Sequence, residues 1–223
     1  MKRFFLIALT LVIAVGVASQ LRYLIPVLEL RHHNPEETAF MERARQHGPV
    51  RHEWRDYEQI ADDLKRAVLI SEDARFMEHI GFDWRGIRHA IERNEEAGRP
   101  VAGGSTVTQQ LAKNLFLSSE KSYTRKIQEA LIALMLEATL SKKRILELYL
   151  NTAQWGNRLF GAQAAARHYF DVDARALSPT QAAQLAVLLP RPSYYDVRGT
   201  TEYVEQRTLW IQKQLPLVRI PPP

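Results

Sequence analysis

The sequence predicts a mainly α-helical domain that follows one N-terminal membrane-spanning helix. Apolar residues recur at helical spacings of three and four along much of the chain, and alternating strand patterns are nearly absent. An uncharged, mostly apolar run covers residues 4–19, and apart from Arg22 the apolar character resumes over residues 21–28. Because a membrane-spanning helix needs about 17–25 residues, this stretch is long enough to serve as an anchor.

The alternative for the N-terminus is a cleaved secretory signal. The small residues Val17-Ala18-Ser19 suit a signal peptidase, but the apolar run is long for a signal peptide. In either case the positive-inside rule places Lys2 and Arg3 in the cytoplasm and the rest of the chain outside.

The remaining chain divides into three predicted parts. Residues 29–56 are polar and rich in Arg, His and Glu, which is typical of a linker, and residues 57–215 form the folded domain. The tail at 216–223 ends in three prolines and is expected to be flexible. Helical spacing, together with a capping signature at Ser178-Pro179-Thr180-Gln181, predicts helices over 60–70, 108–116, 125–140, 141–150 and 178–189.

The composition limits the possible chemistry but does not identify the binding partner. The 223 residues include 30 Lys and Arg against 25 Asp and Glu, a net charge of +5, which favours an anionic partner such as nucleic acid, anionic lipid or a phosphorylated substrate. The chain has no cysteine. A disulfide framework, a Cys-ligated zinc site and a Cys nucleophile are therefore excluded.

Glu72 is the first candidate for chemistry, because it directly follows the apolar run of residues 67–70. Partial desolvation there raises the pKa of a carboxyl group toward the range of a general base. The alternative is that Glu72 and Asp73 form an ordinary solvated acidic turn.

The second candidate is the glycine-rich stretch of residues 103–114. Its two glycines permit close backbone approach, and Ser105 or Thr106 can cap the helix that follows, whose free N–H groups suit an anion. A polar face at spacings of three and four carries Thr106, Gln110, Lys113 and Asn114. This pattern fits a diphosphate, although the glycines are not followed by the G-K-[ST] of a Walker P-loop. The alternative is a glycine-rich turn before a helix whose polar side is merely hydrated.

The third candidate is Glu129, which lies at the start of an apolar stripe on the next predicted helix. Arg125 lies four residues earlier and can pair with it. The alternative role is purely structural, a buried Arg–Glu pair that fixes the helix.

Together these three stretches resemble the signature motifs of the peptidoglycan glycosyltransferases, a family also found as the first domain of class A penicillin-binding proteins. The first motif matches at Glu72, Asp73, Phe76, His79 and Gly81. The second matches at Gly103, Gly104, Ser105, Thr106, Gln109, Gln110, Lys113 and Asn114. The third matches at Arg125, Lys126 and Glu129, and a fourth covers Ile145 to Asn151. The similarity extends from about residue 57 to residue 195 without a transpeptidase domain, as in the monofunctional, single-pass members.

The resemblance implies a lysozyme-like, two-lobed helical fold and a role for each matched residue. It implies that Glu72 is the catalytic base, that Glu129 is a second essential glutamate, and that Lys113 binds the diphosphate. A further cation of the family, commonly arginine, falls on Lys121, where lysine keeps the charge but loses the bidentate fork. The other matched residues of the first three motifs are implied to bind substrate.

The reaction implied is polymerisation of lipid II into β-1,4 glycan strands with inversion, releasing undecaprenyl diphosphate. Protein cations or a divalent cation such as Mg²⁺ or Mn²⁺ would neutralise the leaving group, and no organic cofactor is expected. The implied partners are lipid II, the lipid-linked strand, the membrane and other proteins of cell-wall synthesis or division, but not nucleic acid. The implied location is the bacterial inner membrane, with a cytoplasmic N-terminus and a periplasmic catalytic domain.

Two other functions remain as alternatives. One is a lysozyme-like hydrolase or lytic transglycosylase, and the other is an inactive membrane scaffold for cell-wall synthesis.

Two structural expectations have open alternatives. Five apolar residues are expected either to rest on the membrane or to pack in the core: Phe116, Leu117, Trp155, Leu159 and Phe160. Residues 87–101 are expected to form a mobile flap or a plain surface loop.

Overall fold

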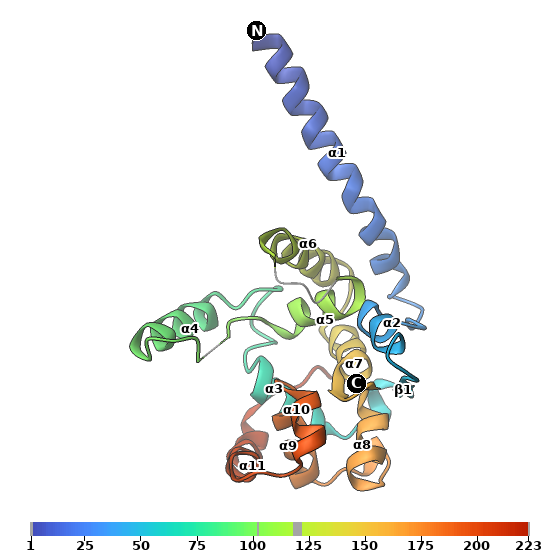
Figure 1. Cartoon of the computed structure of the whole chain (residues 1–223), viewed down its shortest axis with the longest axis vertical. Coiled ribbons are helices and arrows are strands. Elements are labelled where there is room, and N and C mark those ends of the chain that lie inside the picture. The colour runs from blue at the N-terminus through green and yellow to red at the C-terminus, as the bar shows by residue number, and fades with distance from the viewer. Residues whose placement is uncertain (1, 102, 118–121, 223) are drawn as a thin grey trace.

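The computed structural model describes residues 2–101, 103–117 and 122–222, and the chain is mainly helical, as predicted (Figure 1). Helix α1 (Lys2–Glu29) extends away from the other helices, and its C-terminal part packs against α6 (Tyr123–Thr139). Within the described residues, no helix combines the length and apolar character needed to cross a membrane. The anchor at residues 1–28 stays a prediction.

Five helices lie close to where the periodic pattern predicts them. They are α3 (Asp62–Glu72), α5 (Val107–Phe116), α6, α7 (Lys142–Thr152) and α9 (Pro179–Leu188). Each of the last four begins after a Ser or Thr whose hydroxyl accepts a backbone N–H three residues later, which satisfies one of the free donors at the helix start. The predicted capping signature is present at Ser178, with Pro179 in the first helical position.

Other elements have no counterpart among the predicted ranges. The further helices are α2 (Ala39–Arg45), α4 (Trp84–Glu96), α8 (Ala162–Phe170), α10 (Pro192–Arg198) and α11 (Glu202–Gln214). Short 3-10 turns are η1 (Tyr57–Gln59), η2 (Ala174–Ala176) and η3 (Leu215–Leu217). Most of the predicted flap at 87–101 is therefore helix α4, which starts where the Asp83 side chain accepts the N–H of Gly86.

The second half of the predicted linker belongs to the folded domain. Strand β1 (Arg51–His52) pairs in parallel with β3 (Leu159–Phe160), which pairs antiparallel with β2 (Gln154–Gly156). A strand this short shows no alternation in the sequence, and its partner lies more than a hundred residues away. The domain therefore begins before residue 57.

Burial decides one open alternative, and contacts of the C-terminal tail correct one expectation. Trp155, Leu159 and Phe160 are fully buried around this small sheet, so they belong to the core and not to a membrane surface. The tail is also held: the Tyr57 hydroxyl donates to the backbone oxygen of Pro221 at 2.7 Å, and Ile220 packs against the core. A proline-rich tail cannot be helical, but its carbonyl oxygens can still accept hydrogen bonds.

The helices form two groups with α7 between them (Figure 1). In one group α5 packs against α6 and α7, and in the other α3 packs against α9 and α11. The C-terminus of α3 meets the N-terminus of α5, where the Asp73 side chain accepts the backbone N–H of Val107 at 3.0 Å. Glu72, the last residue of α3, therefore lies at the junction of the two groups.

Candidate active site

Glu72 is held in a defined position by side chains from two helices. Its Oε2 accepts a hydrogen bond from the Gln110 amide on α5 at 2.8 Å. Its Oε1 lies 3.3 Å from the Ser71 hydroxyl, whose other acceptor is the backbone oxygen of Ala186 at 3.2 Å. Because a hydroxyl has one proton to donate, Oε1 is the less engaged oxygen and the one available to a ligand.

Burial raises the pKa of the Glu72 carboxyl above its ordinary value, and the neighbouring charge of Asp73 acts in the same direction. The hydrogen bonds from Gln110 and Ser71 and the charge of Lys113 oppose this rise but do not cancel it. The predicted partial desolvation of Glu72 is confirmed. A carboxyl with a raised pKa is a stronger base when ionised, which suits proton abstraction near neutral pH.

Tyr149 completes this arrangement from α7. Its buried hydroxyl donates to the Gln110 carbonyl oxygen at 3.0 Å, which leaves the amide NH₂ of Gln110 directed at Glu72. Burial raises the pKa of Tyr149 well above its ordinary value, so the hydroxyl keeps its proton. Tyr149 falls in the fourth motif, but the sequence assigned it no role, because it lies 39 positions from Gln110 and looks like an ordinary core residue of an apolar helix.

Asp73 joins the first two motifs instead of facing solvent. Besides the N–H of Val107, it accepts a hydrogen bond from the His79 ring at 2.8 Å. The Thr106 hydroxyl, which caps α5, donates to the backbone oxygen of Gly81 at 2.7 Å. The alternative of a solvated acidic turn is therefore wrong for Asp73, whose contacts hold the start of α5 beside Glu72.

A cluster of charges from α5 and α6 lies next to Glu72. The buried Glu129 carboxylate pairs with Arg125 at 2.9 Å and with Lys126 at 2.7 Å, and the Lys126 ammonium also donates to the Ser105 hydroxyl at 3.2 Å. Burial lowers the pKa of Lys113, whose charge interacts with Glu129 and with Glu72. Three cations thus gather around one paired carboxylate, and the structure brings together residues that the sequence separates by up to 57 positions.

Two cavities meet at Glu72. One, of about 170 Å³, extends from Glu72 and Asp73 to Gly103, Gly104 and Ser105. The other, of about 390 Å³, extends from Glu72 and Gln110 toward α9 and α11. The predicted base therefore lines both cavities.

The remaining predicted residues fall into different positions. Phe76 is buried in the core, and Gln109 is buried because it completes the capping box with Thr106. Asn114 is buried on α5, and Gly104 lies against Ile87, where an added Cβ would be only 3.0 Å from the Ile87 side chain. Lys121 lies outside the described residues.

Two carboxylates of this site already have protein partners at both oxygens. Both Glu129 oxygens pair with cations, and both Asp73 oxygens accept hydrogen bonds from the protein. Within the described residues, no group of three or more His, Asp or Glu side chains is arranged to hold a metal. The positive charge that the site residues themselves offer to a ligand comes from Arg125, Lys126 and Lys113.

Several known proteins that resemble this chain share one description. A biosynthetic peptidoglycan transglycosylase of Alcanivorax borkumensis is 65% identical over 215 residues, which cover 96% of this chain and 88% of that protein. Proteins of the same description from Chromobacterium violaceum and Aromatoleum aromaticum are 49% and 52% identical, covering 87% and 84% of this chain and 89% and 85% of those proteins. The family model described as Transglycosylase matches residues 38–216, a range that includes α2, β1 and every site residue above. The chain therefore belongs to the transglycosylase family.

Proposed function

We propose that this chain is a peptidoglycan glycosyltransferase that polymerises lipid II into β-1,4 glycan strands and releases undecaprenyl diphosphate. The observation that carries the proposal is the position of Lys113, whose charge acts on both Glu72 and the Glu129 cluster. A base and a group of cations side by side suit the attack of a hydroxyl on a carbon that bears a diphosphate. The family and the relatives described as biosynthetic peptidoglycan transglycosylases support the same reaction.

Glu72 supplies the base for the acceptor. Its Oε1 takes the proton of the acceptor 4-hydroxyl while the oxygen forms a bond to the donor's anomeric carbon. The bond from that carbon to the diphosphate oxygen breaks, and its electron pair leaves with the diphosphate, which inverts the anomeric centre. Gln110 and Tyr149 position Glu72 and do not contact the reacting atoms.

The cations stabilise the leaving group. Arg125, Lys126 and Lys113 lie where negative charge develops on the diphosphate, and such preorganised charges are worth more in a partly buried site than in water. A diphosphate needs no protonation to leave once its charge is neutralised, unlike the leaving group in glycoside hydrolysis. Glu129 holds Arg125 and Lys126 in this position through its two ion pairs.

Contact with the membrane is also part of the proposal. Residues 1–28 form the anchor, which supports an inner-membrane enzyme with its catalytic domain in the periplasm. An exposed apolar stripe runs along α6 at spacings of three and four, through Tyr123, Ile127, Leu131 and Leu134. Helix α6 lies on the side of the domain from which α1 extends (Figure 1), and Gln128 of α6 donates to Gln20 of α1 at 2.7 Å. This surface suits a bilayer in which the substrate's lipid tail remains.

The test is glycan polymerisation with the purified full-length chain and lipid II. Wild type is expected to produce glycan strands, and Glu72→Gln, which keeps the shape and removes the base, is expected to lose at least about 100-fold in rate. A Glu72→Gln variant that retains the wild-type rate would show that Glu72 is not the base.

The same purified chain distinguishes glycan polymerisation from the lysozyme-like alternative when it is incubated with finished peptidoglycan and with lipid II. A hydrolase or lytic transglycosylase with this fold would release soluble fragments from finished peptidoglycan and would leave lipid II unpolymerised. The charged residues around Glu129 favour polymerisation, because cleavage of a glycan has no diphosphate to bind.

A further inference from the structure

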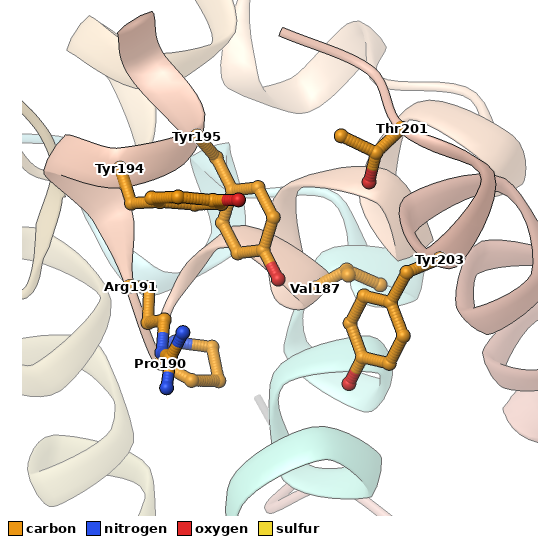
Figure 2. A pocket seen from close by; sticks show the side chains of 7 residues that line it. All are labelled: Val187, Pro190, Arg191, Tyr194, Tyr195, Thr201 and Tyr203. Atoms are coloured by element: carbon orange, nitrogen blue, oxygen red, sulfur yellow. The ribbon is translucent and has the colours of Figure 1, made fainter. Parts of the chain in front are cut away.

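A third cavity continues from the larger of the two cavities that meet at Glu72, and it lies beyond α9. It has a volume of about 540 Å³ and shares Val187, Pro190 and Tyr203 with the cavity that reaches Glu72. Its walls come from the end of α9, from α10 and from the start of α11 (Figure 2). The two cavities together form one groove that starts at the predicted base, and we call the part beyond Tyr203 the distal pocket.

Aromatic rings and hydroxyl groups dominate the distal pocket. Tyr195 and Tyr203 lie on either side of Val187, and the Tyr194 ring packs edge-on against Tyr195 with centroids 5.1 Å apart (Figure 2). Tyr194 and Tyr203 are exposed, and Thr201 adds a hydroxyl to the wall. Exposed tyrosines that gather around a hollow suit the apolar faces and hydroxyls of sugar rings.

Two arginines give the groove its charge. Arg191 lines the distal pocket, and Arg207 lines the part of the groove near Glu72. Neither guanidinium has a carboxylate within 4.0 Å among the described residues, in contrast to the paired Arg125. Among the residues that the structure describes, no Asp or Glu lines the distal pocket. An unneutralised guanidinium beside tyrosines favours a ligand with a carboxylate, which it binds through two parallel hydrogen bonds.

The position of the distal pocket excludes the lipid end of the substrate. The helices α9, α10 and α11 lie at the end of the domain opposite the N-terminus of α1, whereas α6 lies on the side of α1 (Figure 1). The first turn of α6 carries Arg125 and Lys126. A diphosphate tethered to a bilayer therefore belongs at Lys126 and Arg125. Whatever occupies the distal pocket is the part of the substrate that is far from the lipid.

We infer that the distal pocket binds a peptide-bearing segment of the glycan strand, with Arg191 contacting a stem-peptide carboxylate and Tyr203 contacting a sugar ring. This inference rests on the proposed function, in which the substrate is a glycan whose sugars carry peptides. The occupant lies along the groove from Glu72, so the pocket holds the strand while its reacting end is at the base. Arg191 and Tyr203 are therefore binding residues remote from the reacting atoms.

The experiment measures binding separately from catalysis. The probes are a lipid-free tetrasaccharide of the glycan with intact stem peptides and the same molecule with its peptide carboxylates converted to amides. Their dissociation constants for the full-length chain in detergent are measured by calorimetry. Arg191→Ala is a suitable variant because the Arg191 side chain makes no capping hydrogen bond to α10. The matched control is Arg175→Ala, which removes an exposed arginine outside the groove.

Wild type is expected to bind the intact probe about tenfold more tightly than the amidated one, as for a hydrogen bond to a charged group. Arg191→Ala removes that preference, Tyr203→Ala weakens binding of both probes, and Arg175→Ala binds as wild type does. Equal binding of the two probes by wild type, or an intact preference in Arg191→Ala, would overturn the inference.

Lipid II polymerisation measured on the same samples separates this inference from the proposed function. Polymerisation by wild type without binding that depends on Arg191 refutes the distal pocket alone. Binding that depends on Arg191 in a chain that does not polymerise lipid II supports the pocket and refutes the proposed reaction.

Discussion

Replacing Gln110 with leucine should move the pH dependence of polymerisation, because Gln110 is the strongest hydrogen-bond donor to the predicted base. The amide of Gln110 lies 2.8 Å from Glu72 Oε2 and stabilises the ionised form of the carboxyl. Burial alone raises the pKa of Glu72, so removing this opposing interaction raises that pKa further.

The magnitude follows from the strength of that hydrogen bond. A hydrogen bond to a charged group contributes about 1.5–3 kcal/mol, and one pKa unit corresponds to about 1.4 kcal/mol, so the pKa of Glu72 should rise by about one to two units. Glu72 must be ionised to accept a proton, so the rate rises with pH. The acidic limb of the pH–rate profile should therefore shift to higher pH by about the same amount.

The assay is the initial rate of lipid II polymerisation from pH 5 to pH 9 (about the range in which a perturbed carboxyl titrates). The matched control is Gln206→Leu, because the Gln206 amide also donates to a carboxylate, that of Glu202, but on the exposed face of α11. The control should leave the acidic limb in place. An unshifted limb in Gln110→Leu, with a wild-type plateau, would refute the assignment of Glu72 as a base tuned by Gln110.

Three further predictions concern the support of the site. Tyr149→Phe removes the hydroxyl that orients Gln110. The acidic limb of the pH–rate profile should therefore shift to higher pH by less than one pH unit, roughly half the effect of losing Gln110. A shift to lower pH would contradict this prediction. Lys113→Ala should lower kcat/KM for lipid II by about 100-fold or more, with less loss in Lys113→Arg, because a charge facing the leaving group is lost; equal rates for the two variants would contradict it. Thr106→Ala removes both the cap of α5 and the bond to Gly81, and chemical denaturation should show a loss of about 1–2 kcal/mol in unfolding free energy; unchanged stability would exclude this role for Thr106.

Local signals account for the part of the fold that was predicted. The Ser178-Pro179 start of α9 and the long apolar stripe of α6 depend only on residues within a few turns of each other, so they can be recognised in the sequence. Elements whose stability comes from distant partners were not predicted. Strand β1 exists because Arg51 pairs with Leu159. Helix α4 was not predicted either, and it buries only Ala90. Burial of Trp155 follows from the same long-range pairing.

The candidate site was likewise predicted from the sequence only in part. The spacing of residues in each motif left open whether Glu72 was an acidic turn, whether the glycine-rich stretch was a plain loop, and whether Glu129 was only structural. The resemblance of the ordered motifs to a known family favoured catalysis, and the family match covers all three. The role of Tyr149 and the distal pocket could not be predicted, because hydrogen bonds and cavities between separate helices leave no periodic pattern in the sequence.

The sequence by itself determined the helical class, the positions of the capped helices and the set of charged residues available for a diphosphate. Each of these depends on residue type and short-range spacing, which the order of amino acids specifies directly. Only the tertiary structure decided that Asp73 faces inward while Glu72 faces two cavities, and that Gln110 and Tyr149 set its hydrogen bonds. Burial and orientation depend on which distant helices pack together, and the pKa of a carboxyl depends on that packing.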